Sequence, residues 1–287
     1  MNTKSLLIVV LILALASMAC NFTINLPERN VRTGPTVVDD ITVEAPAQGQ
    51  SANLSLAFGA GKLNISPGAG DMLVSGTASF NVPEFKPEVS VTGSRVRIEQ
   101  GEQLRVIPNL GRNLVNEWDL QLGDSPMSLR INAGAYEGRY ELGGLAIEDL
   151  EISDGAAESR VTFSEPNLVE MSSLRYTTGA SSVTLEGLAN ANFEDMYFRS
   201  GAGTYTLEFS GDLQRDATVT IESGLGNVRI VLPEGVSGRV SFDGGLSNVD
   251  MDGEWGRSGN DYVQEGSGHQ VTFLVKMGAG NLELRSR

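Results

Sequence analysis

The chain has 287 residues, with 21 Lys and Arg against 36 Asp and Glu, so its net charge at pH 7 is −15. Nucleic-acid binding requires clustered cations, and a chain this acidic has none to cluster, so composition argues against a nucleic-acid partner. Hydrophobic residues make up 40% and charged residues 20%, which is typical of a folded protein rather than a disordered one. The 34 glycines are well above the average share of roughly 7% and indicate many tight turns.

The first twenty residues are typical of an export signal. Lys4 precedes an apolar run from Leu6 to Ala16, which is too short to cross a bilayer, and small residues follow it. Cys20 stands directly after this segment and is the only cysteine of the chain, so an intramolecular disulfide is excluded. We therefore expect a signal peptide over residues 1–19.

The stretch Ala16-Ser17-Met18-Ala19-Cys20 resembles the lipobox of bacterial lipoproteins. That resemblance implies cleavage after Ala19, a diacylglycerol thioether on the Cys20 sulfur and acylation of the new amino terminus. Ser17 departs from the leucine that is commoner at that position. The membrane, reached through this lipid, is then the first expected partner, because two or more buried acyl chains anchor a protein stably. A short uncleaved membrane anchor is the alternative. We expect a location at the cell membrane or outer membrane, facing away from the cytoplasm.

The next segment, residues 20–50, shows scant alternation and contains Pro27, Pro35 and Pro46. Such composition predicts an extended tether behind the lipidated cysteine.

The body of the chain repeats one phrase, in which an alternating apolar segment leads into a Gly-Ala or Gly-Leu turn and a second alternating segment follows. The turn glycines are spaced by 21 to 24 residues, a regularity that indicates repeating units of about 22 residues each. These glycines are Gly134, Gly155, Gly179, Gly201, Gly224 and Gly245.

Alternation with period two predicts strands with one face inside and one face in water. One such pair of strands cannot bury its apolar face, whereas stacked copies can cover one another. The sequence therefore predicts an all-β fold, an elongated β-solenoid of stacked two-strand repeats over residues 124–287. The recurring glycine is expected where every coil needs either a positive φ or a close approach of two backbones.

The N-terminal part is less regular, and residues 51–123 are predicted to be a distinct β subdomain. Within it, residues 54–65 carry the same phrase as residues 271–284 near the C-terminus. We expect these two segments to be end coils or caps of the stack.

A family resemblance rests on Asn116-Glu117-Trp118-Asp119-Leu120 and on later turn phrases such as Ile131-Asn132-Ala133-Gly134-Ala135 and Thr178-Gly179-Ala180-Ser181-Ser182. These segments resemble the bacterial toast-rack proteins of unknown function, over about residues 50–287. They are also similar to β-repeat adhesins and to the C-terminal domain of cell-wall-active antibiotic response regulators. The resemblance implies stacked β-repeats in the cell envelope and supplies no catalytic residues.

Three segments could carry chemistry. His269, the only histidine, lies in a polar loop, where a solvated side chain is the simpler interpretation. Gly59-Ala60-Gly61-Lys62 lacks the following Ser or Thr of a phosphate loop and is read as a turn. Asp250, Asp252 and Glu254 form a weak candidate calcium site, because calcium prefers oxygen ligands, although the ligand spacing of known loops is missing. The sequence indicates no cofactor and no other metal site.

A carbohydrate-active enzyme would need converging carboxylates, and no pair of acids stands out from the others. Tyrosines could form a strip for stacking sugars, with half or more of them expected to be core or scattered surface residues. These tyrosines are Tyr136, Tyr140, Tyr176, Tyr197 and Tyr205.

The sequence thus favours a non-enzymatic, lipid-anchored envelope protein that presents a β-solenoid to an envelope protein, to a glycan or to other cells. Two alternatives stay open. One is a regulator of an envelope-stress sensor that responds to cell-wall antibiotics, and the other is a carbohydrate-active enzyme.

Overall fold

A computed structural model describes residues 33–47, 49–101 and 114–287. The described chain is nearly all β and forms one 15-stranded sheet, with two short 3₁₀ helices and no α-helix. In chain order its elements are β1 (Val37–Glu44), β2 (Ala52–Pro67), β3 (Met72–Phe80), η1 (Pro83–Phe85), β4 (Pro87–Thr92), β5 (Arg95–Gln100), β6 (Asn116–Leu122), β7 (Met127–Glu141), β8 (Ile147–Thr162), β9 (Met171–Glu186), η2 (Leu188–Ala191), β10 (Phe193–Glu208), β11 (Ala217–Leu232), β12 (Val236–Asp252), β13 (Gly256–Ser258), β14 (Asp261–Gln264) and β15 (Ser267–Ser286).

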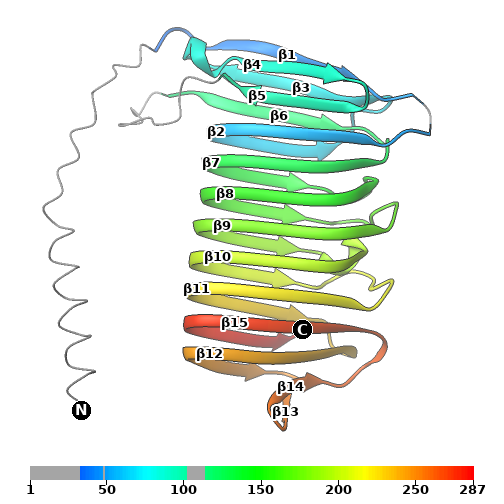
Figure 1. The fold of residues 1–287 in the computed structure, drawn as a ribbon, viewed down its shortest axis with the longest axis vertical. Helices are drawn as coiled ribbons and strands as arrows, with labels where there is room; N and C mark the ends of the chain where they lie inside the picture. The colour runs from blue at the N-terminus through cyan, green and yellow to red at the C-terminus, as the bar shows by residue number, and fades with distance from the viewer. Residues whose placement is uncertain (1–32, 48, 102–113) are drawn as a thin grey trace, which may run out of the picture.

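The body is a stack of eight long strands in the order β2-β7-β8-β9-β10-β11-β15-β12, and every neighbouring pair is parallel. Each strand bends back on itself near its middle, so that the stack has two layers joined along one rim (Figure 1). We call the segments before and after the bend the first and second arms. The predicted elongated all-β solenoid is confirmed, and the two strands predicted for each repeat are the two arms of one continuous bent strand.

The core lies between the two arms of every coil. Alternate side chains point inward, as in β10, where Met196 and Phe198 on the first arm face Tyr205 and Leu207 on the second, all four being 1% exposed or less. Aromatic rings pack from coil to coil in this space, with 5.6 Å between the ring centroids of Tyr176 and Phe198. Burial between the arms holds each coil closed, and backbone pairing holds the coils together.

The bend carries one glycine in every coil, and the distances between neighbouring backbones explain why. A Cβ on Gly179 would lie 2.3 Å from the Gly155 carbonyl oxygen, and a Cβ on Gly201 would lie 2.6 Å from that of Gly179. The prediction offered a positive φ or a close backbone approach, and at this position the close approach is the cause. Two residues further on, some coils have a second glycine with positive φ, such as Gly203 at 155°. The crest glycines, as we name the first set, are Gly59, Gly134, Gly155, Gly179, Gly201, Gly224, Gly278 and Gly245.

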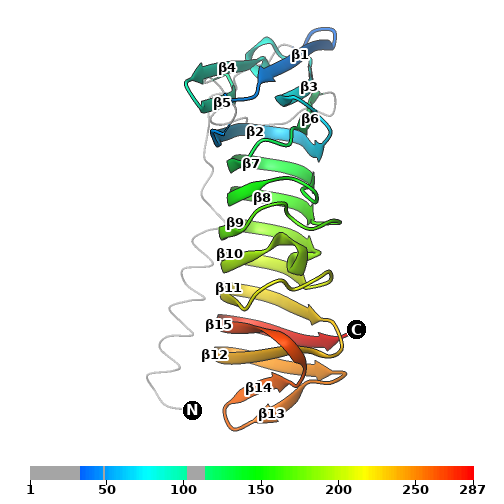
Figure 2. The same cartoon turned by 90° about the vertical axis from the view of Figure 1, so that its right-hand side faces the viewer.

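The order of the last coils corrects the prediction for residues 271–284. They were expected at the end of the stack, but β15 lies between β11 and β12, so β12 is the last coil. The chain leaves β12 through the hairpin of β13 and β14 and then returns to fill the position next to β11 (Figure 2). Residues 54–65 do behave as expected, since β2 is the first coil of the stack.

The N-terminal end of the stack is covered by short strands. The first arm of β2 pairs with β5 and its second arm pairs with β6, while β3, β1 and β4 extend this cap. The prediction of a tether over residues 20–50 is wrong for Val37–Glu44, which forms a strand paired with β3. The division at residue 123 stays a prediction, although β2 on its N-terminal side pairs with β7 along most of its length.

The C-terminal end is covered over only part of its length. β14 pairs with residues 238–241 of β12, and the buried Trp255 packs against Gly238. Gln264, which is fully buried, donates to the carbonyls of Pro233 and Val236 and closes the same corner. Among the described strands, none pairs with the remaining edge of β12, from Phe242 to Asp252.

Candidate functional site

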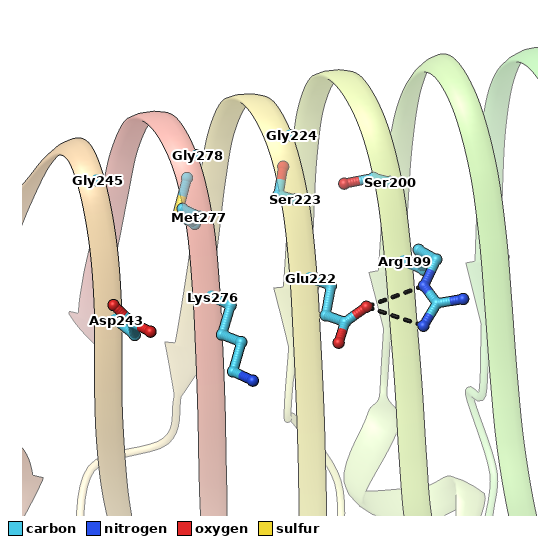
Figure 3. A pocket seen from close by; sticks show the side chains of 10 residues that line it. All are labelled: Arg199, Ser200, Glu222, Ser223, Gly224, Asp243, Gly245, Lys276, Met277 and Gly278. Carbon is cyan, nitrogen blue, oxygen red and sulfur yellow. Dashed lines mark hydrogen bonds and ion pairs between the residues drawn. The ribbon is translucent and has the colours of Figure 1, made fainter.

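The outward face of the first arms carries a row of alternating charges across the last four coils. Register places Arg199 beside Glu222, Glu222 beside Lys276, and Lys276 beside Asp243. The guanidinium of Arg199 donates to Glu222 through Nε at 3.0 Å and Nη2 at 2.9 Å (Figure 3). Lys276 makes no ion pair within 4 Å among the described residues, so this charge ladder contains an exposed ammonium between two carboxylates. The ladder could not be recognised in the sequence, because Lys276 lies 33 positions after Asp243 in the chain but one coil before it in the stack.

The ladder borders a shallow cavity of about 400 Å³ at the crest of these coils. Gly224, Gly278 and Gly245 line it with bare backbone, because no side chain stands at the bend. Ser200 and Ser223 also contribute to its lining, and both side chains are buried. The depression combines charged and polar groups on an open surface, and it has no enclosed apolar chamber of the kind that small-molecule sites usually have.

Of the five tyrosines considered for sugar stacking, four are core residues. Tyr136, Tyr140, Tyr176 and Tyr205 are at most 6% exposed, which agrees with the expectation that half or more would be unavailable. Tyr197 is 41% exposed on the first arm of β10, and the guanidinium of Arg175 lies 5.3 Å from the centre of its ring. A single aromatic ring with a neighbouring cation is available on this face.

The buried tyrosines surround a carboxylate inside the stack. Asp154 accepts hydrogen bonds from Tyr176 at 2.7 Å and Ser181 at 3.3 Å, and also from Thr178. Burial, reinforced by the negative charge of Asp154, raises the pKa of Tyr136 to about 12. Burial likewise raises the pKa of Tyr176 and Tyr140. These groups are closed off from solvent, so the network stabilises the three coils β7, β8 and β9 rather than forming a reaction site.

On the outer faces, several acids pair with an arginine of the neighbouring coil. Glu151 lies 2.9 Å from Arg130, and Glu283 lies 2.8 Å from Arg229. Glu186 likewise pairs with Arg160. Such ion pairs between adjacent coils are the arrangement expected for strand-to-strand stabilisation, and they differ from the two converging carboxylates of a glycosidase.

The weak calcium candidate does not come together as a cage. Asp250 is bound by Arg285 at 2.6 Å, and Glu254 accepts the backbone N–H of Gly235 at 2.9 Å. Asp252 points to solvent beside the same arginine. Over the described ranges of the chain, no group of three or more His, Cys, Asp or Glu side chains is placed to hold a metal ion.

The other two candidates are structural in this fold. His269 lies near the start of β15, not in a loop as predicted, and its Nδ1 lies 3.3 Å from Asp216. The Gln270 N–H and His269 lower the pKa of the Asp216 carboxyl. Gly59–Lys62 forms the bend of β2, as predicted, and a Cβ on Gly61 would lie 2.0 Å from a backbone oxygen. Cys20, the predicted lipidation site, lies outside the described residues. In the part of the chain that the structure covers, no helix has the length and apolarity to cross a membrane.

Comparison with known families decides the relationship. Residues 32–186, more than half of the chain, match the model of the N-terminal domain of toast_rack. The chain belongs to this toast-rack family. The resemblance seen in the sequence is thereby confirmed, while the links to lipoproteins and to antibiotic response regulators stay predictions.

Solved structures with the same fold include a candidate cell adhesion protein from Clostridium sporogenes. It is 21% identical, with a TM-score of 0.50, and the match covers 88% of this toast-rack chain and all of the other. A candidate adhesin from Parabacteroides merdae is 9% identical, with a TM-score of 0.38, over 88% of this chain and 98% of the other. No curated protein matches the chain. At 21% identity the likeness to the Clostridium sporogenes protein shows the fold alone.

Proposed function

We propose that this toast-rack protein is a non-enzymatic, lipid-anchored protein of the cell envelope that presents its stack as an interaction surface for adhesion. The observation that carries the proposal is the stack itself, eight coils in parallel register with a continuous exposed face. On that face the carboxylates of Glu151 and Glu222 are each held by an arginine of the neighbouring coil. The candidate adhesins among the structural neighbours support the same class of function.

Anchoring enters through Cys20. About 17 residues separate this cysteine from the start of β1, which is the capped end of the stack, so the tether can span at most roughly 60 Å. With a diacylglycerol group on Cys20, the cap would lie nearer to the membrane and β12 would lie at the far end.

The experiment uses full-length protein in living cells, with a photo-crosslinking amino acid in place of Tyr197 on the first arm or of Thr184 on the second arm. We expect position 197 to trap an envelope protein or glycan and position 184 to trap much less. A Cys20→Ala variant should lose both incorporation of a labelled fatty acid and membrane retention. Retention of that variant in the membrane without label would refute the anchor. If the only crosslinked partner were a sensor protein, the proposed function would be regulation instead of adhesion. If the purified protein turned over an envelope glycan, the proposed function would be catalysis.

A further inference from the structure

The last coil leaves an edge of the sheet without a partner. Residues 238–241 of β12 are covered by β14, whereas Phe242–Asp252 pairs with β15 on one side and with none of the described strands on the other. We call this segment the open edge. An unpaired edge offers a row of backbone N–H and C=O groups to any extended chain that can reach it.

The side chains of the open edge are apolar on the inner face and acidic on the outer face. Phe242 and Val249 are only half-buried, and Met251 is 38% exposed, although residues at these positions in the interior coils are buried. Asp243 and Asp252 face outward, and neither makes an ion pair within 4 Å among the described residues. Leu246, next to the crest, is 86% exposed.

The opposite edge of β12 shows which sequence suits this strand. There β15 places Leu282 and Leu284 beside Val249 and Met251, so apolar residues meet apolar residues. It also places Lys276 beside Asp243 and Arg285 beside Asp252. Arg285 binds Asp250 at 2.6 Å as well. The strand that pairs with β12 therefore places apolar residues beside the inner face and bases beside Asp243 and Asp252, while Glu283 stands beside Asp250.

We propose that the open edge binds an extended polypeptide segment in which apolar residues alternate with Lys or Arg, added as a further strand beside β12. Backbone hydrogen bonds supply affinity in this mode of binding, and alternate side chains supply specificity. The acids on β12 select against acidic strands by like-charge repulsion. The open edge also contains no proline and no lysine, two of the residues that commonly protect sheet edges. This inference rests on the proposed interaction function and names the kind of partner.

The test uses purified protein and a fluorescent peptide with the sequence Lys-Met-Gly-Ala-Gly-Asn-Leu-Lys-Leu-Arg-Ser. The peptide copies residues 276–286, with lysine in place of Glu283 so that a base faces Asp250. We expect saturable binding by fluorescence anisotropy. Asp252→Lys should weaken this binding by about tenfold, since one reversed charge at the edge is expected to cost about 1.4 kcal/mol. Glu158→Lys is the matched control, because it makes the same charge change on the exposed second arm of β8, and it should leave affinity unchanged.

Two further measurements keep the inference open to refutation. Peptides that are N-methylated at alternate residues lose the donors of one edge only, so one of the two alternating sets should lose binding and the other should retain it. The proposal would be overturned if both methylated peptides bound equally well, or if a shuffled peptide bound as tightly as the original. It would also be overturned if the Asp252→Lys variant bound the original peptide as tightly as the unchanged protein does. Sedimentation that shows a dimer dissolved by Met251→Lys would also overturn it, by making a second copy of the chain the occupant. Failure of the peptide to bind would leave crosslinking through Tyr197 and fatty-acid labelling of Cys20 unaffected, so the two proposals fail separately.

Discussion

The two ends of the stack are closed to different degrees. At the N-terminal end both arms of β2 have a partner strand, and Trp118 of β6 is fully buried, with its ring 5.1 Å from that of Phe58. At the C-terminal end β14 and Trp255 cover the base of the first arm of β12 and leave its second arm open. A solenoid needs caps at both ends to stay soluble and monomeric, so an end left partly open is where its next contact is expected.

Replacing the tryptophan at each end in turn should give the largest difference in stability between the two ends. Trp118→Ala should lower the free energy of unfolding by about 3 to 5 kcal/mol, since it empties a fully buried ring site between the cap and the first coil. Trp255→Ala should lower it less, and should mainly speed amide exchange in β12 and β14, because only one corner of the last coil depends on it. Urea unfolding and hydrogen exchange measure the two effects. Equal losses for both variants would show that the two ends are equally integral to the stack.

The crest glycines compare the interior of the stack with its open end. Gly179→Ala should cost about 3 kcal/mol, because its Cβ would lie 2.3 Å from the Gly155 oxygen and neighbours on both sides prevent β9 from moving. Gly245→Ala places a Cβ 2.8 Å from the Gly278 oxygen, but β12 can shift toward its open side, so we expect a loss of about 1 kcal/mol. Urea midpoints check this order. A larger loss at residue 245 would show that β12 is held as rigidly as an interior coil.

Alkaline pH should distinguish the polar interior around Asp154 from the apolar interior elsewhere. Unfolded tyrosine ionises near pH 10, whereas Tyr136 in the native state has a pKa of about 12, so the native state holds more protons between these values. Stability contributed by the neutral hydroxyl is therefore present below pH 10 and falls as the pH rises toward 12, by about 2 to 3 kcal/mol.

Tyr136→Phe removes this titration and should reduce the loss of stability between pH 10 and 12 without abolishing it, because burial also raises the pKa of Tyr140 and Tyr176. The expected cost at pH 7 is about 1 kcal/mol. Tyr197→Phe, at an exposed ring, is the control for the substitution itself. Thermal melting across this range provides the measurement. An unchanged slope in Tyr136→Phe would mean that other buried groups carry the alkaline transition.

Much of this architecture was predictable because short-range sequence patterns specify each repeat. Strict alternation fixes which side chains face inward, and the glycine spacing of 21 to 24 residues fixes one bend per coil. These are short-range patterns, and they led directly to a stacked solenoid.

The features that could not be predicted all depend on neighbours distant in sequence. The strand Val37–Glu44 has too brief an alternation to stand out, and it is stabilised by antiparallel pairing with β3. The burial of Asp154 is not evident from its own segment, because its partners Tyr176, Thr178 and Ser181 come from the following coil. The charge ladder was hidden for the same reason, since it exists only once β15 is placed between β11 and β12.

Charge reversals test whether electrostatic pairing helps to position β15 between β11 and β12. Without β15, Glu222 of β11 and Asp243 of β12 would be adjacent acids, whereas Lys276 now separates them. Lys276→Glu would place three carboxylates in a row, and we expect it to lower stability by about 0.5 to 1 kcal/mol, with the loss reduced by salt because the face is exposed. The double variant Lys276→Glu with Asp243→Lys restores an opposite-charge pair between positions 276 and 243 but leaves Glu222 beside a glutamate at position 276, so it should recover part of the loss, and a double-mutant cycle measures the coupling between positions 276 and 243. Zero coupling at low salt would mean that apolar pairing alone, such as Phe273 beside Val219 and Val240, positions β15 in the stack.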